Sequence, residues 1–263
     1  MILISVPHGS SVVPKSLKKR LNQKANLREI AEPGIEKIVK WPGSKIIAAG
    51  FHQCFSNVNR FRNNIDLRTG EIYAPQMGVF PELDFRGEPI YRPRSHLSEL
   101  EKEELLSKHF DPFYRKLEKE ISTGKYSFLI DAHAMNSSFS NYAGSGKDPV
   151  KRPDIGIGNN GGKNADPHAD GGELTMHPGA VCAIAQSIRS IGYSCGINSP
   201  FRGGAIIQTF ASRIPCLQLE INKNLYMTAD DGEIIPASIK KLNEVLSEVF
   251  MEATIANLLA FGI

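Results

Sequence analysis

The stretch that most constrains this chain is Tyr126–His133, in which an apolar run leads directly into an aspartate and a histidine. Five residues rich in aromatic and aliphatic side chains predict a buried strand, which carries Asp131 and His133 to its carboxyl end. In a parallel α/β sheet, ligands and catalytic groups collect at the carboxyl ends of the strands. An imidazole there can hold a metal ion while a carboxylate orients the ring. The alternative is a histidine that only forms a hydrogen bond in a loop.

Two further apolar runs place a side chain of the same kind at a strand end. Ile2–Val6 is short and continuously apolar, which is typical of a central parallel strand, and Pro7 ends it just before His8. Residues 214–222 predict another strand, with Glu220 near its end. An unpaired carboxylate within an apolar alternation is costly, and this favours a functional role for Glu220.

Helical patterns lie between the predicted strands. Ser98 and Glu101 form a capping-box pattern that begins a long helix, which we expect to extend to about Ser122 with a possible interruption at Pro112. Further strands are predicted over residues 44–50 and 192–197, and further helices over residues 179–190 and 234–259. Because the chain shows no internal repeat, low-complexity tract or linker, we expect one α/β domain over residues 1–263.

Several polar residues lie on the predicted connections. Glu32 precedes Pro33 at the start of a helical pattern, where a carboxylate either favours the helix dipole or binds a metal ion. Arg60 follows Asn59 in a loop poor in core-forming residues, and a guanidinium beside an amide suits a carboxylate ligand. Arg202 precedes two glycines and is a second candidate anion-binding residue. The long polar connection over residues 136–172 is typical of a functional loop or a mobile lid.

Composition excludes several classes of function. Among 263 residues the net charge is only +3 and the basic residues are scattered, so we expect no nucleic-acid partner. No stretch approaches the ~18 apolar residues of a membrane helix. The N-terminal run lacks the features of a signal peptide, and the four cysteines are far apart, so we expect a cytoplasmic protein with reduced thiols. No glycine-bounded elbow exposes a cysteine or serine nucleophile.

The candidate residues together suggest metal-dependent chemistry. Two imidazoles and a carboxylate leave an open position on Zn²⁺ for water, as in catalytic zinc sites. A glutamate that does not bind the metal can take a proton from that water and pass it to a leaving amine. Nearby arginines would bind an anionic substrate or stabilise an oxyanion. This inventory fits hydrolysis of an amide bond in a small substrate that carries a carboxylate.

The chain also resembles a known family, the N-formylglutamate amidohydrolases (deformylases). The resemblance covers nearly the whole chain and rests on six strings that occur in the family's order: residues 6–10 (VPHGS), 57–60 (NVNR), 131–137 (DAHAMNS), 152–154 (RPD), 198–204 (NSPFRGG) and 217–226 (LQLEINKNLY). Around the substrate the chain departs from the family pattern, with Gly9 and Ser10 in exchanged order, Asn57 in place of an acid and Ala134 in place of a serine.

The resemblance implies a fold, a reaction and a metal site. The fold would be the three-layer α/β/α arrangement of the zinc-carboxypeptidase-like superfamily, with a mixed, mostly parallel central sheet. The reaction would be hydrolysis of an N-acyl amino acid, with N-formyl-L-glutamate and water giving formate and L-glutamate as the type reaction. One zinc ion per chain would be bound by His8, His133 and an acid that we place at Glu32. Glu220 would be the general base or acid, and we expect Asp131 to support His133 from behind.

The same resemblance places Asn59 and Arg60 as the pair that binds the substrate carboxylate, and Arg202 as the arginine of an Arg-Gly-Gly loop. Two other functions remain open at this point. One is a metallo-carboxypeptidase or amidase that acts on a small peptide or cell-wall-like substrate. The other is a non-catalytic protein that binds an amino-acid-like anion through Arg60 and Arg202.

Overall fold

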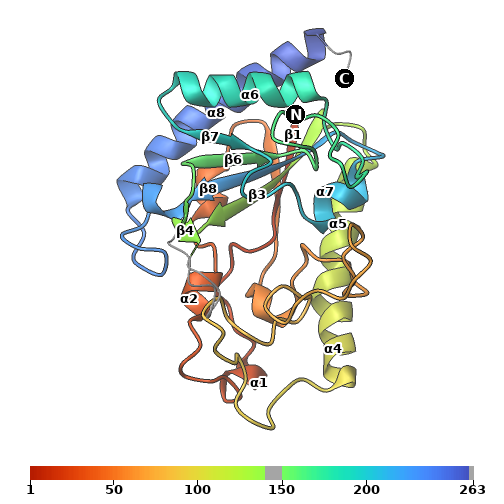
Figure 1. Cartoon of the computed structure of the whole chain (residues 1–263), viewed down its shortest axis with the longest axis vertical. Helices are drawn as coiled ribbons and strands as arrows, with labels where there is room; N and C mark the ends of the chain where they lie inside the picture. The colour runs from red at the N-terminus through yellow and green to blue at the C-terminus, as the bar shows by residue number, and fades with distance from the viewer. Residues whose placement is uncertain (140–149, 261–263) are drawn as a thin grey trace.

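The computed structural model describes residues 1–139 and 150–260, and a six-stranded sheet forms its centre (Figure 1). In spatial order the strands are β2 (Ser44–Ala48), β1 (Ile2–Val6), β3 (Phe128–Met135), β8 (Cys216–Asn222), β6 (Ile155–Gly158) and β7 (Cys195–Ile197). The first four are parallel, whereas β6 is antiparallel to β8 and β7 is parallel to β6. The mixed, mostly parallel sheet expected from the sequence is therefore confirmed.

Helices cover both faces of the sheet, which explains why every residue of β1, β3 and β8 is buried. On one face lie α3 (Ile35–Ile38), α6 (Pro178–Ser190) and α8 (Pro236–Ala260). On the other lie α5 (Asp111–Ile121) and α7 (Ala205–Phe210). Figure 1 shows these layers with the sheet between them. The expected three-layer α/β/α fold is confirmed.

A second region adjoins the carboxyl ends of β1 and β3. It contains the short helices α1 (Lys15–Lys18) and α2 (Leu27–Ile30), the 3-10 turn η1 (Gln53–Phe55), α4 (Glu99–Leu105) and the irregular chain over residues 56–98. A separate apolar cluster that includes Phe55 and Tyr91 holds it together. The region is tied to the sheet where Glu32 N–H donates to the carbonyl of His8 over 3.1 Å. It appears below the sheet in Figure 1.

The long helix differs from the prediction in its middle. Ser98 caps α4 with the predicted capping box, in which Glu101 bonds back to Ser98. The chain then passes through a π-helical segment, Leu106–Phe110, before α5 begins. Pro112 is the second residue of α5, and Phe110 and Asp111 before it already have helical dihedral angles, so the π-helical segment and α5 form one continuous helix. The helix is therefore irregular in the turn directly before Pro112, next to the position at which an interruption was expected.

Strand β6 was not predicted from the sequence, in which residues 136–172 have the composition of a single connection. Gly156 and Gly158 lower the strand propensity of this segment. The structure explains both glycines, since a Cβ on Gly156 would lie 3.3 Å from the Cβ of Glu220 and a Cβ on Gly158 would lie 2.4 Å from the carbonyl oxygen of Arg202. The connection also holds a small two-stranded sheet of β4 (Ser138–Phe139) and β5 (Val150–Lys151). The proposed lid falls partly on residues 140–149, which lie outside the described residues.

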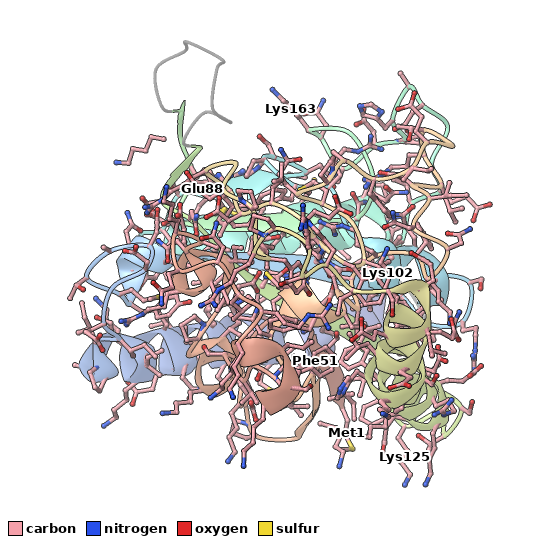
Figure 2. All side chains as sticks on the ribbon, turned by 90° about the horizontal axis from the view of Figure 1, so that it is seen from below. Met1, Phe51, Glu88, Lys102, Lys125 and Lys163 are labelled. Carbon is pink, nitrogen blue, oxygen red and sulfur yellow. The ribbon has the colours of Figure 1, made fainter. Side chains whose placement is uncertain are left out.

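Charged side chains are spread around the outline of the molecule. Figure 2 shows Lys102, Lys125 and Lys163 at well separated positions. This distribution matches the scattered basic residues of the sequence. Within the described part of the chain, no helix is both long enough and apolar enough to cross a membrane.

Candidate metal centre

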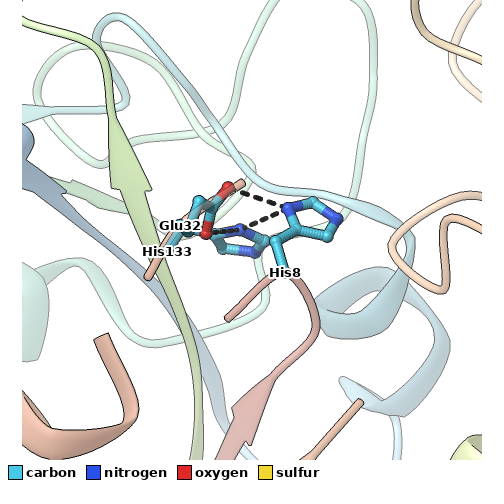
Figure 3. Close-up of side chains that lie close together, drawn as sticks. All are labelled: His8, Glu32 and His133. Carbon is cyan, nitrogen blue, oxygen red and sulfur yellow. Dashed lines mark hydrogen bonds and ion pairs between the residues drawn. The ribbon is translucent and has the colours of Figure 1, made fainter. Parts of the chain in front are cut away.

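Three segments bring His8, Glu32 and His133 into one buried group (Figure 3). His8 follows the end of β1, and His133 lies near the end of the neighbouring β3. Because the two strands pair in parallel with Ser5 opposite Asp131, both imidazoles leave the same edge of the sheet. Glu32 reaches them from the turn after α2, and its Oε2 accepts a 3.0 Å hydrogen bond from Ala134 N–H.

The facing atoms of this group have the spacing of metal ligands. His8 Nδ1 lies 2.9 Å from Glu32 Oε1 and 3.2 Å from His133 Nδ1. His133 Nδ1 lies 3.3 Å from Glu32 Oε2. Ligands that surround zinc tetrahedrally at about 2.0–2.1 Å are about 3.3 Å from one another. The residues therefore fit a metal ion, and the buried group can hold one.

The outward nitrogen of each imidazole has an acceptor of its own. His133 Nε2 lies 2.9 Å from Asp131 Oδ2, and His8 Nε2 lies 2.8 Å from Asn57 Oδ1. The backbone N–H of Asn59 also donates to Asn57 Oδ1 over 3.0 Å, which identifies that atom as the amide oxygen. A proton on each Nε2 leaves the Nδ1 lone pairs of both rings facing Glu32. This is the arrangement in which a second partner orients a metal-binding histidine.

The protein charges strongly affect the ionisation of this group. Burial opposes the charged form of Glu32, but His8 and His133 more than offset this and hold its pKa well below the ordinary value. Burial likewise opposes the charged form of His133, but Asp131 and Glu32 raise its pKa well above the ordinary value. Without a metal ion the group is held by protons between nitrogen and oxygen. A cation that binds there takes the place of those protons.

Glu220 lies beside this group on β8, directly opposite His133 on β3. Its carboxyl group is buried, and Gln218 Nε2 donates to its Oε1 over 2.8 Å. Burial raises the pKa of Glu220 to about 8, while the positive charges of His133 and Arg152 act in the opposite direction. A carboxyl group with a raised pKa near a candidate metal site has the properties of a general acid and base.

Asn59 contacts the same group directly, whereas Arg60 contacts Asn59. Asn59 is buried, its Nδ2 lies 3.0 Å from His133 Nε2, and its Oδ1 accepts from Ile206 N–H over 3.2 Å. Arg60 is half-buried, with its Nη1 donating to the carbonyl of Asn59 over 2.8 Å and its Nε donating to the carbonyl of Met77. Its guanidinium also lies over the ring of Tyr73 at 5.4 Å.

Arg202 makes its described contacts within the neighbouring loops. Its Nε donates to the carbonyl of Gly161 over 3.0 Å and its Nη2 to the carbonyl of Asn160 over 2.7 Å. Both terminal nitrogens pair with Asp170, at 2.6 and 3.2 Å. The guanidinium thus links the loop after β7 to the loop after β6. The sequence offered no sign of this pairing, because Asp170 lies in a polar stretch 32 residues away.

Two supporting contacts were not predicted. In the sequence Asn57 was noted only as a departure from the family pattern. Its contact with His8 is seen only in the folded structure. Lys223 is buried after β8, where its Nζ donates to the carbonyl of Glu29 over 2.6 Å and to Asn136 Oδ1 over 2.9 Å. This ammonium therefore joins α2, which precedes Glu32, to the end of β3. Lys223 lies within the string 217–226 that resembles the family, but the sequence did not predict that its ammonium group makes these contacts.

The fold and the site together define a class, the three-layer α/β/α proteins with a candidate metal centre at the carboxyl ends of parallel strands. Within that class, residues 1–227 match the family model described as N-formylglutamate amidohydrolase. The chain belongs to the N-formylglutamate amidohydrolase family, as the six sequence strings predicted.

Individual proteins support this family assignment. An N-formylglutamate deformylase of Pseudomonas aeruginosa is 26% identical, with 93% of this chain and 92% of that protein covered. One from Pseudomonas putida is 24% identical, with 97% and 92% covered. The crystal structure of N-formylglutamate amidohydrolase from Ralstonia eutropha has the same fold, with a TM-score of 0.76, 20% identity, and coverage of 97% of this chain and 93% of that one.

Proposed function

We propose that the protein hydrolyses the amide bond of an N-formyl or other N-acyl amino acid, with one zinc ion bound by His8, Glu32 and His133. The observation that carries the proposal is the spacing of 2.9–3.3 Å among the facing atoms of these three residues, with Glu220 at the neighbouring strand position. Both Pseudomonas relatives are named N-formylglutamate deformylase. We propose N-formyl-L-glutamate as the first substrate to test.

The protein side chains divide the work of this reaction. A bound zinc ion would supply Lewis acidity and acidify a water molecule. Glu220 would accept a proton from the attacking water molecule and would deliver it to the amino-acid nitrogen as the amide bond breaks. Asp131 and Asn57 hold the imidazoles of His133 and His8 in the orientation that exposes their Nδ1 atoms.

We propose Asn59, Arg60 and Arg202 as the residues that bind the carboxylate of the substrate. The support for Asn59 is its contact with His133, and the support for Arg60 is its hydrogen bond to the carbonyl of Asn59. For Arg202 the support is the family resemblance alone, and substrate would have to compete with Asp170 for its guanidinium.

The deciding experiment measures product formation by metal-loaded protein on N-formyl-L-glutamate, acetylated amino acids and short peptides. We expect turnover of an N-acyl amino acid that a chelator abolishes and zinc restores. Glu220→Gln should lower kcat by about 10²–10⁴-fold and retain the metal. Preferential cleavage of peptides would instead identify a carboxypeptidase. Unchanged ligand binding after metal removal, with no product from any substrate, would identify an anion-binding protein and refute the proposal.

A further inference from the structure

Two neighbouring strands present the same two-residue pattern beneath the candidate site. β3 and β8 pair in parallel, with Asp131 opposite Gln218 and His133 opposite Glu220. Residues two positions apart on a strand point to the same face of the sheet. Asp131 and Gln218 therefore form one row, and His133 and Glu220 form a second row above it.

Each residue of the lower row contacts the residue above it on its own strand. Asp131 Oδ2 lies 2.9 Å from His133 Nε2, and Gln218 Nε2 lies 2.8 Å from Glu220 Oε1. Gln218 is buried, and among the described residues its Oε1 has no hydrogen-bond partner. A buried amide oxygen without a partner destabilises the fold. Among the described residues, the hydrogen bond from Nε2 to Glu220 is therefore the polar contact that the Gln218 side chain makes.

No other strand offers Glu220 a comparable contact. On its far side Glu220 faces Gly156 of β6, which has no side chain, and a Cβ there would lie 3.3 Å from the Cβ of Glu220. Within the described part of the chain, Gln218 makes the hydrogen bond to the Glu220 carboxyl group. This hydrogen bond uses one of the two carboxyl oxygens, Oε1.

The neutral donor suits a group that must both accept and release a proton. An arginine or lysine at position 218 would hold Glu220 as a carboxylate by its charge. An apolar residue would leave the buried carboxylate without a partner. An amide N–H orients the carboxyl group without cancelling its charge.

We propose that Gln218 is the positioning residue for Glu220, as Asp131 is for His133. This inference rests on the proposed function, in which Glu220 transfers the proton. The two strands then support separate parts of the reaction: β3 supports the metal ligand and β8 supports the general base. Loss of the support on β3 should weaken zinc binding, whereas loss of the support on β8 should lower kcat.

The test compares Gln218→Met with Asp131→Asn, each close in shape to the native side chain. For Gln218→Met we expect kcat to fall by about 10–100-fold because Glu220 is misplaced, with KM and the dissociation constant for zinc within about threefold of wild type. For Asp131→Asn we expect zinc affinity to fall by about 10–100-fold. Wild-type kcat in Gln218→Met would overturn the inference. A loss of zinc affinity equal to that of Asp131→Asn would also overturn it.

Two measurements keep the test independent of folding and of the proposed function. Gln218→Leu repeats the loss of the donor with a different shape, and the melting temperature of the metal-free variants reports folding. Crystal structures of zinc-loaded wild type and Gln218→Met report the Glu220 conformation whether or not any substrate turns over. An unchanged Glu220 conformer would overturn the inference. Inactivity of the wild type on every N-acyl amino acid would instead refute the proposed function.

Discussion

At the scale of single residues, the carboxyl groups of Glu32 and Glu220 interact electrostatically with the same histidine, His133, but have opposite shifts in pKa. Glu32 lies between two imidazoles and remains ionised. Glu220 is buried against a neutral amide and keeps its proton to higher pH. Environments that separate the pKa values of two carboxyl groups are how a protein assigns one to bind charge and the other to transfer protons.

The raised pKa of Glu220 predicts a pH dependence of stability in the metal-free protein. Between the ordinary value of 4.5 and about 8, folded Glu220 holds a proton that the unfolded chain has lost. The folded state therefore binds more protons than the unfolded chain in this pH window. The contribution of Glu220 to the free energy of unfolding falls as the pH rises through it. We expect the free energy of unfolding of Glu220→Gln, relative to wild type, to increase from pH 5 to pH 8 in denaturant titrations. A difference that does not change with pH would contradict this.

At the scale of elements, the site depends on how the loop after β7 packs against the second region on one side and against the loop after β6 on the other. Asn59, from that region, fills the space above Gly204 at the start of α7. Arg202, just before Gly204, reaches the other way to the loop after β6. The loop after β7 thus contributes both to packing and to the proposed substrate site, and single substitutions can separate the two roles.

Gly204→Ala should displace Asn59 without unfolding the chain. A Cβ at this position would lie 2.2 Å from Asn59 Oδ1, and its nearest neighbours are all atoms of that side chain. The backbone at Gly204, with φ of −101°, accepts alanine. We expect KM for the N-acyl substrate to rise by about tenfold, as for loss of one hydrogen bond to a charged group. Gly50→Ala is the control, because its Cβ would meet nothing within 4 Å. Equal KM values would contradict the role proposed for Asn59.

Arg202→Met and Asp170→Asn separate substrate binding from loop packing. Both remove the ion pair, but only the first removes the guanidinium. If Arg202 binds substrate, KM should rise by about 10–100-fold in Arg202→Met and stay near wild type in Asp170→Asn. Steady-state kinetics with melting temperatures of both variants provide the measurement. The same small effect on KM in both variants would assign Arg202 to loop packing.

At the scale of the whole molecule, the candidate metal centre joins segments that are distant in the sequence. His8 and Glu32 come from the first residues of the chain, and His133 comes from the middle of the sheet. Lys223 adds a contribution from the chain after β8 by joining α2 to the end of β3. A cation bound by the three ligands therefore holds the second region against the central sheet.

Metal binding should raise the melting temperature of the protein. At zinc concentrations about 100-fold above the dissociation constant, a ligand that binds only the folded state adds about 2.7 kcal/mol. For a chain of this size that corresponds to about 5 °C. Calorimetry with and without zinc provides the measurement, and Glu32→Gln should lose most of the shift. An equal shift in Glu32→Gln would place the zinc elsewhere.

The sequence by itself determined the strands that carry the site. Ile2–Val6 and the apolar run before Asp131 are continuous enough to predict buried strands, and parallel strands must bring His8 and His133 to one edge. The same logic placed Glu220 beside them. These predictions depend on local apolar patterns and on the regular geometry of a parallel sheet, which the sequence encodes directly.

Only the tertiary structure decided which polar groups meet. The pairing of Asn57 with His8 and of Arg202 with Asp170 joins loops that no sequence period brings together. The strand period places Gln218 and Glu220 on one face, but only the structure shows that their side chains form a hydrogen bond. Strand β6 was missed for a related reason. Its glycines weaken the strand pattern because they leave space for Glu220 and for the backbone at Arg202, a requirement that exists only once the chain is folded.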